Sequence, residues 1–112
     1  MKLITAVIQP YRLEQVKRAL DDIEHPGLTV TEVKGYGAQK GHSEVYRGNE
    51  FRIDFRPKVR IELIVTDEDA DGVIATIVAA ARTGSLGDGK IWTQEISNVV
   101  RVRTGERGNA AV

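Results

Sequence analysis

The chain has 112 residues, in which 16 basic residues balance 16 acidic ones, and it contains no cysteine. This length fits one domain with a buried core, and it is short enough for a site to be shared between subunits. A formal net charge of zero offers no overall field for nucleic acid or an anionic membrane. Without cysteine there is no disulfide framework, thiolate nucleophile or zinc–thiolate site. Any anion-binding site must therefore be local.

The N-terminal stretch, MKLITAVIQPYR, is apolar over only a few residues before Pro10. It is too short for the hydrophobic region of a signal peptide with its cleavage site, and no apolar run approaches the length of a membrane span. We therefore expect a cytoplasmic protein.

Two strands and a helix are predicted in the first third of the chain. Residues 3–8, LITAVI, are apolar and β-branched on both faces, as a buried strand requires, and Pro10 ends them. An amphipathic helix follows, because apolar residues recur at helical spacing until the His-Pro-Gly turn at 25–27: Leu13, Val16, Leu20 and Ile23. Residues 28–33, LTVTEV, predict a second strand.

A third strand is predicted at residues 58–65, where apolar side chains alternate with charged ones. The stretch of about twenty residues before it contains four glycines and many charges, and it has no sustained periodicity. Part of it can extend the flanking strands into a ribbon. A long irregular stretch in so small a domain is more often functional or disordered than structural, so it is the first candidate for a partner surface.

A second helix is predicted within the stretch TDEDADGVIATIVAAARTG, residues 66–84. Acidic residues lie at its start, an apolar face runs along it, Arg82 lies in its last turn and Gly84 just past its end. A last strand is predicted from Ile91 into VVRVRTG at 99–105, and the tail, about 104–112, is expected to be flexible.

The order strand, helix, strand, long loop, strand, helix, strand predicts an α+β fold of the ferredoxin-like, split βαβ type. Two helices would cover one face of the four-stranded sheet. Because the strands carry more apolar residues than one face needs, we expect a homo-oligomer that buries the second face.

The stretch TGSLGDGK, residues 83–90, has the glycine and lysine spacing of a Walker phosphate loop. Ile91 replaces the magnesium-binding hydroxyl, and the stretch follows a helix and precedes a strand, which is the reverse of the Walker order. Two interpretations remain. In the first, the backbone amides at Gly84, Gly87 and Gly89 are available to bind an anion, and Lys90 adds a positive charge. In the second, the stretch is a glycine helix cap followed by an Asp-Gly turn.

Arg101 and Arg103 lie two residues apart in the predicted last strand, so their guanidinium groups would project from one face. Such a pair binds phosphate well, and a solvated face paired to carboxylates explains it equally. Lys58 and Glu62 share a face of the neighbouring strand. These residues indicate a polyphosphate site. They do not indicate a catalytic one, since His25 and His42 lack ligand or triad spacing.

Several motifs together resemble the PII nitrogen-regulatory signal transduction proteins: TVTEVKGYGAQKGHSEVYRGNEF, DFRPKVRIEL, TGSLGDGKIW and VVRVRTGE. The resemblance runs over essentially all 112 residues. It implies a single domain over 1–112 that forms a homotrimer, with a T-loop at about 37–55 and a B-loop at about 82–90. ATP or ADP would bind in clefts between subunits, and 2-oxoglutarate would bind together with Mg-ATP.

The resemblance also implies which residues bind the ligands. Nucleotide contacts fall on Thr29, Gly37, Glu62, Ile64, Gly87, Asp88, Gly89, Lys90, Arg101 and Arg103. Contacts to 2-oxoglutarate fall on Gln39, Lys40, Gly41 and Lys58, and Gln39 would also ligate Mg. The implied protein is a regulator and not an enzyme. Its partners would be an ammonium transporter or nitrogen-metabolism enzymes or regulators, with no direct nucleic acid contact and membrane contact only through a transporter.

Two departures from the family pattern stand out. Phe51 occupies the T-loop position at which many relatives carry a modifiable tyrosine, so nucleotidylation there is chemically impossible. Ala38 replaces a usual arginine that contacts nucleotide phosphates, and losing one charge-assisted contact costs roughly 1 to 3 kcal/mol. An alternative is therefore a PII-like sensor retuned to another metabolite or partner in a carbon or urea pathway. Slow ATP hydrolysis in the same cleft is a further alternative, although no residue is placed as a base.

Overall fold

The computed structural model describes residues 1–25, 27–37, 43–46, 49–52 and 55–112, with backbone pairing alone described for 43–46 and 49–52. In chain order the elements are β1 (Lys2–Ile8), the 3₁₀-helix η1 (Pro10–Arg12), α1 (Leu13–Asp22), β2 (Thr29–Gly35), β3 (Ser43–Tyr46), β4 (Asn49–Arg52), β5 (Arg56–Val65), α2 (Asp67–Ala81), β6 (Gly89–Glu95) and the 3₁₀-helix η2 (Gly108–Ala111).

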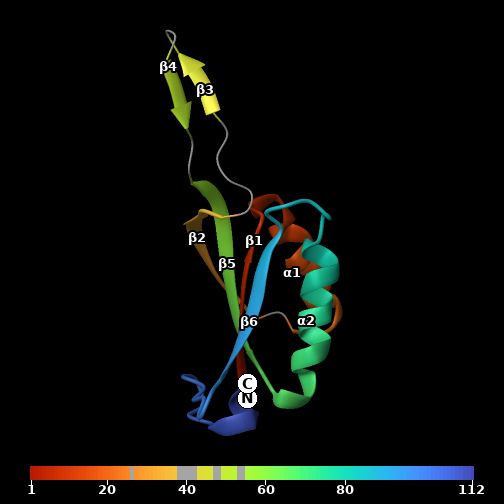
Figure 1. Ribbon diagram of the computed structural model, residues 1–112. Coiled ribbons are helices and arrows are strands. Elements are labelled where there is room, and N and C mark those ends of the chain that lie inside the picture. The colour runs from red at the N-terminus through yellow and green to blue at the C-terminus, as the bar shows by residue number, and fades with distance from the viewer. Residues whose placement is uncertain (26, 38–42, 47–48, 53–54) are drawn as a thin grey trace.

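The main sheet has the strand order β2-β5-β1-β6 and is antiparallel throughout. Both α-helices pack against the same face of this sheet (Figure 1). β1 thus lies inside the sheet, between β5 and β6, which are the third and the last strand of the βαββαβ order. This arrangement confirms the predicted α+β, ferredoxin-like fold.

The core lies between the sheet and the helices. Alternate residues of β1 face it, and Ile4, Ala6 and Ile8 are almost completely buried. Ile61 and Val65 of β5 do the same from the neighbouring strand, since every second side chain of a strand points to the same face. The helices close the core with the residues that the 3.6-residue period predicts: Val16, Leu20, Ala70, Val73, Ile77 and Ala81.

Helix α2 begins at a polar cap. The Thr66 hydroxyl accepts a hydrogen bond from the Asp69 amide at 3.3 Å, and acidic residues follow in the first turn, where the helix dipole favours negative charge. The helix ends at Ala81, because Arg82 has an extended backbone. It is therefore shorter than the sequence predicts, and Gly84 is not its C-terminal cap.

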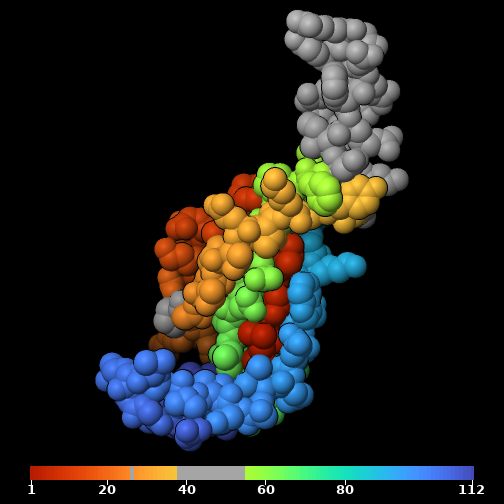
Figure 2. Space-filling view, turned by 90° about the vertical axis from the view of Figure 1, so that its left-hand side faces the viewer, coloured from red at the N-terminus to blue at the C-terminus, as the bar shows by residue number. Residues whose placement is uncertain are grey.

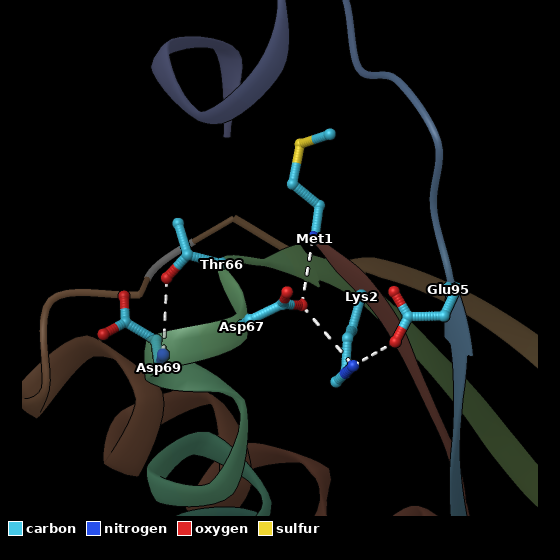
Figure 3. Close-up of polar contacts among 6 residues, drawn as sticks. All are labelled: Met1, Lys2, Thr66, Asp67, Asp69 and Glu95. Atoms are coloured by element: carbon cyan, nitrogen blue, oxygen red, sulfur yellow. Dashed lines mark hydrogen bonds and ion pairs between the residues drawn. The ribbon is translucent and has the colours of Figure 1, made fainter.

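A small ion-pair network ties three elements together at the start of α2 (Figure 3). The Asp67 carboxylate lies 3.0 Å from the Met1 amino nitrogen and 3.4 Å from the Lys2 ammonium, which also pairs with Glu95 of β6. The hydrogen bond from the Met1 amino group is the main reason why the pKa of Asp67 lies below its ordinary value. β1, α2 and β6 are thereby joined at one end of the sheet.

The stretch between β2 and β5 contains a second, two-stranded sheet. β3 and β4 pair antiparallel, with Ser43 opposite Arg52 and Tyr46 opposite Asn49. The irregular sequence pattern did not predict these two short strands individually. Phe51 lies in β4, and Ala38 lies outside the described residues. The role of this stretch as a partner surface stays a prediction.

The last strand ends ten residues earlier than the sequence predicts. β6 pairs with β1, and at Glu95 it reaches Lys2, where its partner strand ends. The following chain bends back on itself: Val100 pairs with Arg107, and the amide of Gly105 donates to the carbonyl of Arg101 at 2.7 Å. The predicted strand over 99–105 is therefore wrong. Residues 99–108 form a turn, which we call the C-terminal turn.

The face of the main sheet that lies opposite the helices is uncovered in a single chain (Figure 2). It carries exposed apolar side chains, including Trp92 at 44% and Ile64 at 37% exposure. The expected burial of this face in an oligomer stays a prediction. No helix of the described residues is both long and apolar enough to cross a bilayer.

Candidate functional site

The predicted ligand-binding residues separate into two groups at opposite ends of the main sheet. One group lies around the B-loop, the connection from α2 to β6, and comprises Lys58 and Gly87 to Lys90. The other lies around the C-terminal turn and comprises Thr29, Glu62, Ile64, Arg101 and Arg103. Since β6 separates the B-loop from the C-terminal turn with seven residues, the two groups are roughly 20 Å apart at 3.3 Å per residue.

The Asp88 carboxylate holds the start of the B-loop. One of its oxygens accepts hydrogen bonds from the amides of Thr83 and Gly84 at 2.8 and 2.9 Å, and the other accepts from the Thr83 hydroxyl. These donors stabilise the ionised form, so the pKa of Asp88 lies below its ordinary value. The Gly84 amide, which the sequence suggested for an anion, is thus already used within the loop.

The Ser85 amide donates to the Thr83 hydroxyl at 3.2 Å, but the two amides after it have no such partner among the described residues. Those of Leu86 and Gly87 donate to no acceptor in the part of the chain that the structure describes. Gly84 and Gly87 have φ values of 89° and 91°, which side chains other than hydrogen rarely permit. The loop therefore presents free donors, although not the full set that the sequence suggested.

Lys58 connects β5 to the B-loop. Its side chain is almost buried, with 8% of the residue exposed, and its ammonium donates to the carbonyl oxygen of Gly87 at 2.6 Å. Burial lowers the pKa of Lys58 and the neighbouring Arg56 adds to this effect, while Asp88 opposes it. Gly35 leaves room for this side chain, because a Cβ there would lie 3.2 Å from the Lys58 Cγ. A cation is thereby placed at the point where the T-loop stem and the B-loop meet.

Gly89 allows the B-loop to end directly against β1. A Cβ at this position would lie 1.7 Å from the Val7 carbonyl oxygen, and the residue has a φ of 105°. No other residue type fits there without moving one of the two strands. Lys90 follows in register with Val7, which places it on the uncovered face of the sheet, on the same side as Lys58.

The second group surrounds a groove of about 480 Å³. Thr29 of β2 lies opposite Glu62 of β5, and both line the groove together with Ile64. Three of the positions that the resemblance assigns to nucleotide contacts are thus brought together. Ala111 and Val112 complete the wall of this groove, a contribution that nothing in the sequence signalled because it depends on how the tail folds back.

Arg101 and Arg103 lie in the C-terminal turn and not on a strand face, and Arg101 reaches Val112 in the wall of the groove. The Arg101 guanidinium donates to the Glu106 carboxylate at 3.1 Å and to the Val112 backbone oxygen at 3.4 Å. Arg103 is exposed in the turn. The prediction that both guanidinium groups project from one strand face is therefore wrong. The alternative interpretation, pairing with a carboxylate, is correct for Arg101.

The remaining predicted residues are only partly placed. Gly37 follows β2 on the B-loop side, whereas Gln39, Lys40 and Gly41 lie outside the described residues. Within the residues that the structure covers, no three His, Cys, Asp or Glu side chains gather closely enough to hold a metal ion. The expected 2-oxoglutarate and Mg contacts at these positions stay predictions.

The whole chain is similar to proteins of one family. The family model described as Nitrogen regulatory protein P-II matches residues 1–106. A nitrogen regulatory protein P-II from Klebsiella oxytoca is 51% identical over 112 residues, and the nitrogen regulatory protein P-II 1 from Escherichia coli K12 is 50% identical over 112 residues. In both cases 100% of each chain is covered.

A solved structure agrees with these matches. It is described as Arabidopsis thaliana PII bound to citrate, and it superposes on this chain with a TM-score of 0.82 and 40% sequence identity, covering 99% of this chain and 91% of that one. The fold, the motifs around the B-loop and the C-terminal turn, and the full-length matches agree, and the chain belongs to the nitrogen regulatory protein P-II family.

Proposed function

We propose that this protein is a homotrimeric sensor of ATP, ADP and 2-oxoglutarate that regulates proteins of nitrogen metabolism. The observation that carries the proposal is the separation of the two groups of cations that the resemblance assigns to the ligands. Lys58 and Lys90 lie at the B-loop, and Arg101 lies roughly 20 Å away beyond the other end of β6. A triphosphate is much shorter than this distance, so Lys90 and Arg101 bind the same phosphates only if they come from different copies of the chain.

The surface of the single chain supports such an assembly. The groove at Thr29, Glu62 and Ile64 opens beside the uncovered face of the sheet, and the B-loop lies at the other end of that face. A neighbouring copy packed on this face brings its B-loop to the groove of the first. The base would lie in the groove, and the phosphates would lie between the B-loop amides and the arginines of the C-terminal turn.

Sensing follows from where the second ligand would bind. We place 2-oxoglutarate at the base of the T-loop, where Lys58 offers a nearly buried cation for its carboxylates. Gln39 would join the Mg of Mg-ATP, with Lys40 and Gly41 beside it. A ligand there shifts the T-loop between conformations only through its different contacts with them. ATP and ADP differ by the phosphate that positions Mg, so the same cleft distinguishes the two nucleotides.

The output would be the T-loop itself. Partner proteins, an ammonium transporter or enzymes and regulators of nitrogen metabolism, would read its conformation, and no turnover of ATP is required. Because Phe51 has no hydroxyl, this regulation would operate without nucleotidylation at that position. Membrane contact would arise only through a transporter partner.

Isothermal titration calorimetry tests this function. Titrating 2-oxoglutarate into the protein should release heat with Mg-ATP present, and much less with Mg-ADP or without nucleotide. A protein that binds neither ATP nor ADP would refute the proposal. Mass measurement in solution should give three copies per particle, and a monomer that binds ATP at full affinity would also contradict it.

A second candidate function is a sensor for a different carboxylate. It is favoured by Ala38 in the T-loop and by the plant relative whose structure is described as bound to citrate. Side-by-side titrations of 2-oxoglutarate, citrate and bicarbonate in the presence of Mg-ATP distinguish the two candidates. Heat from citrate or bicarbonate alone would favour the second.

A further inference from the structure

The B-loop contains an acidic residue at a position where a phosphate-binding loop gains nothing from negative charge. Asp88 lies between Gly87 and Gly89, and its carboxylate would repel the phosphates of a nucleotide bound at the neighbouring amides. The presence of Asp88 therefore needs a role that offsets this repulsion. Its contacts within the loop indicate what that role is.

The contacts close a ring across the B-loop. They run from the Asp88 carboxylate back to the amides of Thr83 and Gly84 and to the Thr83 hydroxyl. The same hydroxyl accepts a hydrogen bond from the Ser85 amide at 3.2 Å. The start of the loop is thus bound to its end, and Leu86 and Gly87 are left at the tip with their amides unused in the described part of the chain.

We infer that Asp88 is a positioning residue, whose carboxylate clasps the start of the B-loop so that the amides of Leu86 and Gly87 stay open toward the phosphates of a bound nucleotide. The inference rests on the proposed function. It assigns to Asp88 an action through the loop backbone, since its oxygens already accept from three donors of the loop.

The competing explanation is that Asp88 serves as the counter-ion of Lys58. The origins of its acidity argue against this. The pKa of Asp88 is lowered first by the hydroxyl and amide of Thr83 and then by the amide of Gly84, with Lys58 contributing least. Lys58 itself donates to the Gly87 carbonyl, which belongs to the same loop. Both side chains therefore hold the loop backbone, from its two sides.

The test uses variants that separate charge from position. Asp88→Glu keeps the charge but moves the carboxylate outward by one methylene, so it cannot close the same ring. Asp88→Asn removes the charge and keeps one acceptor oxygen. Thr83→Val removes one donor of the clasp and leaves the carboxylate intact. Asp71→Asn removes one exposed carboxylate from α2 and serves as the matched control for charge.

Two readouts are measured for each variant. Affinities for ATP and for adenosine come from calorimetry, and exchange rates of the Thr83 and Gly84 amides in the nucleotide-free protein come from NMR. For Asp88→Glu we expect ATP binding about tenfold weaker, which corresponds to about 1.4 kcal/mol. Adenosine binding should be unchanged, because adenosine carries no phosphates for the B-loop amides to bind. Both amides should exchange several-fold faster.

The other variants complete the test. Thr83→Val should weaken ATP binding by about threefold, which is roughly half the free-energy effect of Asp88→Glu, and it keeps the inference testable if Asp88→Glu does not fold. Asp71→Asn should match the wild type. If Asp88→Glu and Thr83→Val bind ATP like the wild type while Asp88→Asn binds it more tightly, Asp88 acts through charge and the inference is refuted. If the wild type binds no ATP, the proposed function fails, and the inference falls with it.

Discussion

The B-loop and the C-terminal turn are both proposed to bind phosphate, yet their local geometry differs. The B-loop offers the open amides of Leu86 and Gly87 on a backbone that its own glycines and Asp88 hold in place. In the C-terminal turn, Arg101 is already engaged by Glu106 and Val112. In the proposed site, the B-loop would receive an anion without rearrangement, whereas Arg101 would have to exchange its existing contacts for it.

This difference predicts that substitutions in the two regions will have different effects on folding stability and on ligand binding. Changes in the B-loop should disturb the backbone and therefore folding, as well as binding. Changes in the C-terminal turn should affect binding with little effect on stability, because an exposed ion pair contributes only about 0 to 1 kcal/mol.

The largest effect is expected for Gly89→Ala. Its Cβ would overlap the Val7 carbonyl oxygen, at 1.7 Å, so β1 and β6 must separate there. We expect a loss of about 3 kcal/mol or more in the free energy of unfolding, measured by urea denaturation. Gly72→Ala is the control: a Cβ there meets nothing within 4 Å, and replacing a helix-interior glycine should stabilise the protein by about 0.5 to 1 kcal/mol. Equal stability of Gly89→Ala and wild type would contradict the described contact.

The next effect is expected for Arg101→Ala. Loss of a charge-assisted contact to phosphate should weaken ATP binding by about tenfold or more, while the free energy of unfolding changes by less than about 1 kcal/mol. Calorimetry and urea denaturation measure the two quantities. Arg107→Ala removes a cation from the same turn and should leave ATP affinity unchanged. An equal loss in both variants would mean that only the total charge of the turn matters.

A smaller effect on stability, with a sharp effect on binding, is expected for Lys58→Met. Burial disfavours the charged form of Lys58, as its lowered pKa indicates, so an apolar side chain of similar length should cost no more than about 1 kcal/mol despite the lost bond to Gly87. Binding of 2-oxoglutarate in the presence of Mg-ATP should be lost. Retention of 2-oxoglutarate binding would remove Lys58 from the proposed site.

The smallest effect concerns acid stability. The pKa of Asp67 lies below its ordinary value of 3.8, so its contribution to stability is complete above that value and is lost as the pH falls through the lower folded pKa. Asp67→Asn should therefore lose less stability than the wild type as the pH falls below about 4. Urea midpoints at several pH values measure this. A loss as steep as that of the wild type would contradict the role given to the Asp67 ion pairs.

Sequence reasoning succeeded where structure is determined locally. The period of Val16 and Leu20 fixed the buried face of α1, and the order of elements was sufficient for the ferredoxin-like fold. It also placed the B-loop correctly between a helix and a strand. The positive φ values at Gly84, Gly87 and Gly89 explain why the glycine spacing in residues 83–90 predicted a loop there.

It failed where the outcome depended on distant parts of the chain. The alternation in VVRVR predicted a strand, but β6 has no partner strand beyond Glu95, and the chain turns back at Gly105 and Gly108, which both have positive φ. The wall that Ala111 and Val112 add to the groove and the clasp of Asp88 are tertiary contacts that no spacing revealed. These contacts determine which donors of the site are open.

The central claim is that each nucleotide site is built from two copies of the chain, and a complementation experiment tests it most directly. Lys90→Ala and Arg101→Ala chains, each with its own tag, are expressed separately and together, and ATP binding is measured. Each variant alone should bind ATP weakly. When equal amounts of the two chains assemble at random, about a quarter of all clefts should combine an intact B-loop with an intact C-terminal turn and regain wild-type affinity. If mixing restores no site, both groups act within one chain or do not bind ATP, and the account is wrong.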